Sequence, residues 1–168
     1  MARNFTIAWK APAPNRPSSA YAQADQVPTT LIQCDAFQPG TADESVMLEG
    51  VLPAEYTGAG TLKVRLLVCA NTTTAADDAR IDIVTEFRTP AAAEAMNVSN
   101  IDATPDSGTV TFSTTAYSLQ VLVISLTPAT TPAAGDHFRI QVRRDQDHAT
   151  DDSLAVDLLV LSYEFYEE

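Results

Sequence analysis

Short runs in which apolar and polar residues alternate recur along this chain. In TLKVRLLVCA at 61–70, every second residue from Leu62 to Val68 is apolar, while Lys63 and Arg65 fall between them. Side chains on a β-strand point alternately to its two faces, so this period of two predicts strands with one buried and one wet face. The other strand-like runs are 5–9, 30–35, 45–52, 80–88, 109–115, 119–126, 137–144 and 154–166.

Two of these runs, LQVLVISL at 119–126 and the C-terminal run 154–166, are apolar on both faces. A strand of that kind needs cover on both sides, either from loops of its own chain or from another subunit. For 119–126 both alternatives stay open. For the C-terminal run we expect a partner chain.

One segment is typical of a helix. PAAAEAMNVSN at 90–100 begins with a proline, which suits a first helical turn, and is rich in alanine. We therefore expect one short helix near residues 90–97. Eight or nine strands with so little helix predict an all-β fold, a jelly-roll β-sandwich of two packed sheets.

The first 30 residues differ from the rest. Residues 10–30 contain four prolines, which favour an extended backbone. FTIAW precedes them, and its alternating Phe5, Ile7 and Trp9 can dock as one face of a short strand, on the same subunit or on a neighbour. We expect an extended, Pro-rich N-terminal arm over 1–30 and a jelly-roll domain over 31–168.

The charge of the chain argues against two classes of partner. The 168 residues carry 22 acidic and 10 basic side chains, which gives a net charge of −12. Such a surface repels phosphate backbones and anionic lipid, so we expect neither a nucleic acid nor a membrane as partner. We see no secretory signal. Cys34 and Cys69 lie in apolar segments, and we expect both to be buried and free.

No motif with a known catalytic mechanism occurs in the sequence. His137 opens a strand-like run and is interpreted as a strand-end residue. The densest polar cluster is DQDHATDD at 145–152, where Asp145, Asp147, Asp151 and Asp152 favour a solvated loop, with calcium as the alternative. We expect no catalytic centre and no cofactor.

Three segments carry a resemblance to a known group of proteins. They are residues 49–70, including the turn LPAEYTGAG at 52–60, residues 81–88, and GDHFRIQVRRD at 135–145. Together they resemble small bacteriophage virion proteins over roughly residues 44–166. The resemblance implies a jelly-roll fold, a homotrimer, and a non-enzymatic role on the phage particle.

The function that this resemblance implies is a capsid decoration (cement) protein, which stabilises the head by binding between capsid subunits. Its partners would be the major capsid protein or another virion protein, after assembly in the cytoplasm of the bacterial host. The alternative is a tail-tip or fibre-associated module that binds a carbohydrate or receptor. The candidate contacts with a subunit or the capsid are Phe5, Ile7, Trp9, Arg139, Arg143, Arg144, Tyr163 and Phe165.

Overall fold

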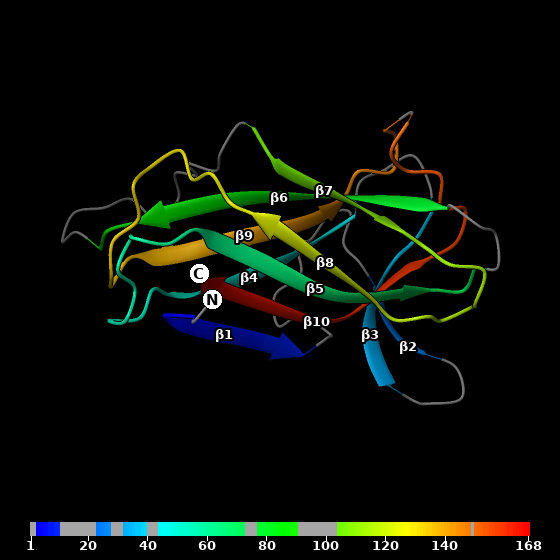
Figure 1. The fold of residues 1–168 in the computed structure, drawn as a ribbon, viewed down its shortest axis with the longest axis horizontal. Helices are drawn as coiled ribbons and strands as arrows, with labels where there is room; N and C mark the ends of the chain where they lie inside the picture. The colour runs from blue at the N-terminus through cyan, green and yellow to red at the C-terminus, as the bar shows by residue number, and fades with distance from the viewer. Residues whose placement is uncertain are drawn as a thin grey trace.

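A computed structural model describes residues 3–10, 23–27, 32–39, 44–72, 77–90, 104–148 and 150–168, with the backbone alone for 23–27 and 32. These residues form two antiparallel sheets that pack face to face (Figure 1). No helix occurs among them. The predicted all-β sandwich is therefore confirmed, while the helix expected near residues 90–97 falls almost wholly outside the described residues.

The first sheet has six strands and the second has four. The first sheet runs in the order β2 (Gln23–Val27), β3 (Ile32–Phe37), β10 (Leu158–Glu167), β5 (Leu62–Ala70) and β8 (Gln120–Ser125), with β1 (Phe5–Lys10) also on β10. The second sheet runs in the order β4 (Ser45–Val51), β9 (His137–Arg144), β6 (Asp78–Arg88) and β7 (Asp106–Thr111).

The strand pairs are nested along the chain. β6 pairs with β7, β5 with β8, β4 with β9 and β3 with β10, all antiparallel. This is the pairing of one long hairpin that has been rolled into two sheets, which is a jelly-roll-like connectivity.

The core lies between the sheets and follows the alternation in the sequence. On β9, Phe138, Ile140 and Val142 are fully buried, while the residues between them are partly exposed. The Phe138 ring meets that of Phe165 on β10, with the ring centroids 4.9 Å apart. Inward aromatic and aliphatic side chains from both layers thus form one core.

β1 docks on its own chain in this structure. It pairs antiparallel with β10 from Phe5↔Glu167 to Lys10↔Ser162. The Phe5 side chain is buried, edge-on to the Phe165 ring at 5.5 Å between centroids. β2 likewise pairs with β3, so two parts of the segment assigned to the arm are strands of the first sheet. Residues 1–2, 11–22 and 28–30 of that segment lie outside the described residues.

β10 is an interior strand of the first sheet, and its outer face, where a partner chain was expected, packs against its own chain: Leu159 is buried in a cluster against which Tyr117 packs. Its neighbours are β5 on one side and β1 and β3 on the other. Tyr163 and Phe165 have no exposed surface, and the outward Leu159 is 5% exposed. The Tyr163 hydroxyl donates a hydrogen bond to the buried Asp35 carboxylate at 2.8 Å. Tyr163 and Phe165 are therefore core residues, with no surface to offer another subunit in this structure.

Both cysteines are buried and neither forms a disulfide, as predicted. Burial raises the pKa of the Cys69 thiol to about 11, so this thiol stays protonated and unreactive at neutral pH. Within the described part of the chain, no helix is long and apolar enough to span a membrane.

Candidate functional site: a polar pocket on the second sheet

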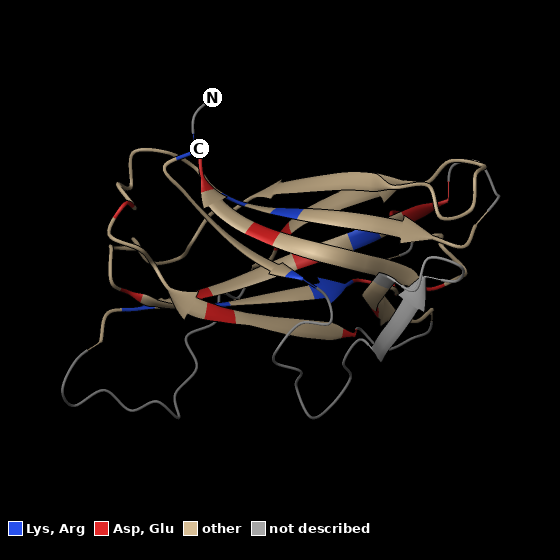
Figure 2. Ribbon diagram, turned by 90° about the horizontal axis from the view of Figure 1, so that it is seen from below, with Lys and Arg blue, Asp and Glu red and all other residues tan. Residues whose placement is uncertain are grey.

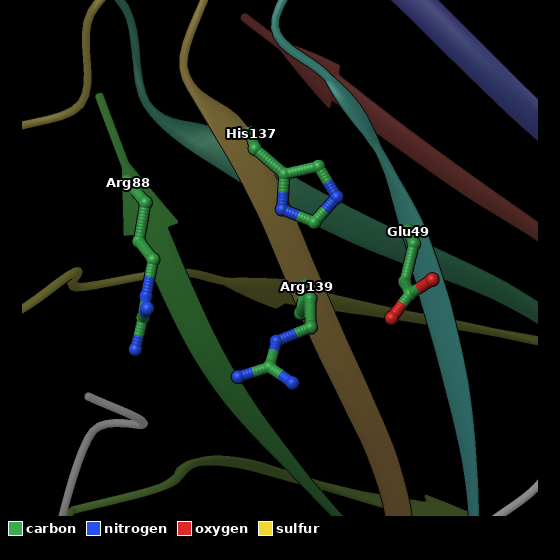
Figure 3. Close-up of a pocket in the computed structure, with 4 residues that line it drawn as sticks. All are labelled: Glu49, Arg88, His137 and Arg139. Carbon is green, nitrogen blue, oxygen red and sulfur yellow. The ribbon is translucent and has the colours of Figure 1, made fainter. Parts of the chain in front are cut away.

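A pocket of about 160 Å³ opens on the outer face of the second sheet (Figure 3). It is lined by Glu49 of β4, Arg88 of β6, and His137 and Arg139 of β9. All four are polar side chains that carry hydrogen-bonding groups. The pocket is therefore suited to a small polar ligand rather than an apolar one.

Strand register brings these four residues together. Arg139 pairs with Glu49 on one side and with Glu86 on the other, which makes a row across three strands. Two residues before Arg139 on β9, His137 pairs with Arg88 of β6 and points to the same face. Directly opposed residues of antiparallel strands lie about 4.5–5.5 Å apart, so two such rows form a compact polar patch.

Glu86 of β6 lies opposite Arg139 and binds both arginines of the pocket. Its side chain is 2% exposed. Its carboxylate accepts hydrogen bonds from Arg88 Nε at 2.6 Å and from Arg139 Nε at 2.7 Å, and Arg139 Nη2 also donates to it. Because this carboxylate binds them, the two guanidinium groups are oriented before any ligand arrives.

The charges of the pocket are balanced. Two arginines are matched by two carboxylates, the buried Glu86 and the exposed Glu49, which flank Arg139 on the neighbouring strands. A charged ligand gains little net attraction from such a set. A neutral ligand with several hydroxyl groups fits better, since each hydroxyl can donate to a carboxylate and accept from a guanidinium.

The cations predicted as contacts separate into different environments. Arg139 lines the pocket. Arg143, also on the outer face of β9, pairs with Asp82 at 2.7 Å. Arg144 is 1% exposed and binds both oxygens of Asp152 at 2.8 and 2.9 Å, so it serves the interior of this chain rather than a contact surface. Figure 2 shows basic and acidic positions side by side on neighbouring strands.

Sequence reasoning missed four members of the site. Glu49, Glu86 and Arg88 lie in the strand-like runs 45–52 and 80–88 but were not singled out, and His137 was interpreted as a strand-end residue. The alternation does place Glu86 and Arg88 on one wet face. Only the alignment of β4, β9 and β6 reveals that they meet Glu49 and Arg139.

The acidic loop at 145–152 is an ion-pair network. Asp145 and Asp151 bind Arg80 at 3.0 and 2.9 Å, and Asp152 binds Arg144. The described residues contain no group of three or more side chains arranged to hold a metal ion. In this structure three of the four carboxylates considered as calcium ligands, those of Asp145, Asp151 and Asp152, are engaged by arginines instead.

A second polar centre explains the LPAEYTGAG turn. The buried Glu167 carboxylate accepts hydrogen bonds from Asn4 Nδ2 at 2.8 Å and from the backbone N–H groups of Thr57 and Gly60 at 3.1 and 3.0 Å. Burial alone would raise the pKa of Glu167, but these hydrogen bonds outweigh it and lower the pKa to about 2. Gly58 has a φ of +68°, and a Cβ on Gly60 would lie 2.9 Å from the Glu168 backbone. The turn therefore ties both termini to the sandwich.

Comparisons with known proteins indicate the fold. No family model matches the chain, and no curated protein matches it. Among solved structures, it is similar to the C-terminal CBM6 of LamC, a laminarinase from the marine Zobellia galactanivorans, at a TM-score of 0.50 and 9% identity, with 97% of this chain and all of that chain covered. It is also similar to the K1 cleaved adhesin domain of Lys-gingipain from Porphyromonas gingivalis W83, at a TM-score of 0.50 and 13% identity, with 98% and 99% covered. At these identities the likeness establishes a shared β-sandwich fold.

Proposed function

We propose that this chain is a non-enzymatic β-sandwich module that binds a neutral carbohydrate in the pocket between Glu49, Arg88, His137 and Arg139. The observation that carries the proposal is the set of donors and acceptors that Glu86 holds in place on an exposed sheet face. Two similar folds, a CBM6 and an adhesin domain, are named as binding modules, which supports the same conclusion.

The composition of the pocket predicts modest affinity. None of its four lining residues is Phe, Tyr or Trp, so a sugar ring would find no large stacking platform there. Hydrogen bonds to charged side chains then supply most of the binding energy. We expect dissociation constants on the order of 1 mM for a single sugar, with avidity gained where several copies act together.

Glu49→Ala is the first test of this pocket. Glu49 is exposed, so its loss leaves the fold intact but removes a charged acceptor that opposes the arginines. We expect binding of a responsive sugar to weaken about tenfold or more. The measurement is a titration of the ¹⁵N-labelled protein against a panel of neutral and acidic sugars, with the signals of His137 and Arg139 followed.

Glu55→Ala provides the matched control, because Glu55 is an exposed glutamate on a loop and its loss changes the net charge equally. It should bind like the wild type. Equal sugar affinities of the two variants would contradict the proposal. A panel in which no sugar shifts the NMR signals of His137 and Arg139 would contradict it as well. Tighter binding of acidic than of neutral sugars would overturn the assignment to a neutral ligand.

A second candidate function is capsid decoration on the surface of a phage particle, favoured by the sequence resemblance over residues 44–166. The residues that carry this resemblance build the turn around Glu167 and the strand β9, so they support the fold more than any one contact. A homotrimer and contacts through Ile7, Trp9, Arg139 and Arg143 stay predictions of this candidate. Its test is copy number in purified particles: hundreds of copies indicate the capsid, and a handful indicate a receptor-binding role at the tail.

A further inference from the structure

The strand β8 lies at an edge of the first sheet and presents an apolar face to solvent. It pairs with β5 on one side, and no described strand pairs with its other side. Leu122 and Ile124 point inward and are buried, while Leu119, Val121 and Val123 are 57, 50 and 45% exposed. Within the described residues, neither of the covers considered for 119–126 is present on this outer face.

This edge lacks the features by which proteins protect their edge strands. Charged side chains, proline and bulges are the common protections against pairing with another chain. Residues 119–126 contain no charge and no proline, and the register with β5 runs unbroken from Lys63↔Ser125 to Val68↔Gln120. An uncharged run of eight residues at an exposed edge stands out in a chain of net charge −12.

The charges beside β8 are neutralised within the chain. On β5, Arg65 lies opposite Val123 and binds Glu164 at 3.2 Å, while Lys63 binds Glu168 at 2.8 Å. The nearest outward neighbour of Val121 is Leu67, which is itself uncharged. Two copies of this face can therefore approach without bringing like charges together, although the molecules as a whole repel each other.

We propose that β8 pairs antiparallel with β8 of a second copy across a twofold axis at Val121, which joins the two first sheets into one continuous sheet. Directly opposed residues in an antiparallel pair point to the same face, so outward residues must meet outward residues. With the axis at Val121, Leu119 faces Val123 of the second copy and Val121 faces its own equivalent. Each of the three exposed aliphatic side chains, on β8 and on the residue just before it, then meets another.

Other registers leave this face incompletely covered. A shift by one residue would set outward against inward side chains. An axis at Leu122 would place Leu119 opposite Ser125. The self-complementary register at Val121 is the reason for choosing a second copy over an unrelated strand, because a twofold contact requires one surface to match itself. The pocket lies on the second sheet, so this pairing does not depend on the proposed carbohydrate binding.

Val121→Lys tests the contact, since it sets two ammonium groups against each other on the axis. We expect the wild type to shift from the 18.0 kDa single chain toward twice that mass between micromolar and near-millimolar concentration. Val121→Lys should weaken this association about tenfold or more. Val51→Lys is the matched control, because Val51 is 55% exposed, lies on β4 and changes the net charge equally. Sedimentation equilibrium measures the masses, and far-ultraviolet dichroism verifies that each variant is folded.

Val121→Cys tests the register. Opposed Cα atoms of an antiparallel pair lie within the range that a disulfide bridges. We therefore expect a covalent dimer after mild oxidation with glutathione disulfide, and none from Val51→Cys; the native cysteines are buried. A wild type that stays a single chain at near-millimolar concentration, a trimer, or equal association of Val121→Lys and the wild type would each overturn the proposal. Failure of Val121→Cys to cross-link while the dimer persists would overturn the register.

Discussion

Replacing Arg144 by methionine is expected to lower the free energy of unfolding by about 3–5 kcal/mol. The Arg144 guanidinium binds both oxygens of Asp152 and donates to the backbone carbonyls of Phe37, Leu154 and Val156. Asp152 is 3% exposed in its side chain, so the variant leaves an uncompensated carboxylate in the interior. It also leaves three backbone carbonyl groups, one at the end of β3 and two just before β10, without this donor. Urea unfolding measures the effect as a lower midpoint with an unchanged slope.

Arg143→Met is the matched comparison on the neighbouring residue. The Arg143 side chain is 31% exposed, and its partner Asp82 also accepts hydrogen bonds from Arg80 and Ser107. We expect a loss of about 1 kcal/mol or less. The double variant Arg144→Met with Asp152→Leu should recover part of the stability lost with Arg144, because it removes the orphaned charge. Equal losses for Arg143→Met and Arg144→Met would show that burial does not distinguish the two arginines.

The contrast between Arg143 and Arg144 shows that the alternation of residues along a strand can predict which of two neighbouring arginines is buried. Phe138, Ile140 and Val142 are inward, and continuing the same alternation places Arg144 inward and Arg143 outward. Grouping the cations of this run as one contact surface overlooked that difference. The signal for a buried arginine was present in the sequence, although its partner Asp152 was considered only as part of an acidic loop.

Pairing between distant segments lay beyond sequence reasoning. Alternation predicts that 5–9 and the C-terminal run are strands, but not that β1 lies beside β10. That pairing places β10 inside the sheet, and Tyr117 of the same chain packs against the outer face of β10, where a partner chain was expected. The pocket depends in the same way on the register of β4, β9 and β6, which no local pattern specifies.

For the outward side chains of β8, the local sequence pattern did identify the feature, and the structure adds the position of the strand in the sheet. The sequence shows that 119–126 is apolar on both faces, and it leaves open what covers the second face. Position at the sheet edge adds the missing information, because an edge strand has a free hydrogen-bonding side as well as an exposed face. A second copy can satisfy both at once, whereas a loop of the same chain would cover only the face.

Glu167→Gln is expected to lower the free energy of unfolding by about 1–3 kcal/mol at neutral pH. The carboxylate accepts hydrogen bonds at both oxygens, from Asn4 and Thr57 on one and from Gly60 on the other. Glutamine offers a single acceptor, so its amide nitrogen meets donors that it cannot satisfy. The turn at 57–60 and the two ends of the chain are then held less firmly.

The pH dependence of this loss distinguishes a charge effect from a packing effect. The pKa of Glu167 is about 2 in the folded protein and 4.5 ordinarily, so its contribution is present above pH 4.5 and is lost as pH falls from 4.5 toward 2. The difference between wild type and Glu167→Gln should therefore shrink across that window in urea unfolding measured at several pH values. Glu164→Gln, on the same strand with partly exposed partners Arg3 and Arg65, should cost less than about 1 kcal/mol. A difference between wild type and Glu167→Gln that stays constant from neutral pH to pH 2 would mean that the carboxylate charge does not hold the turn.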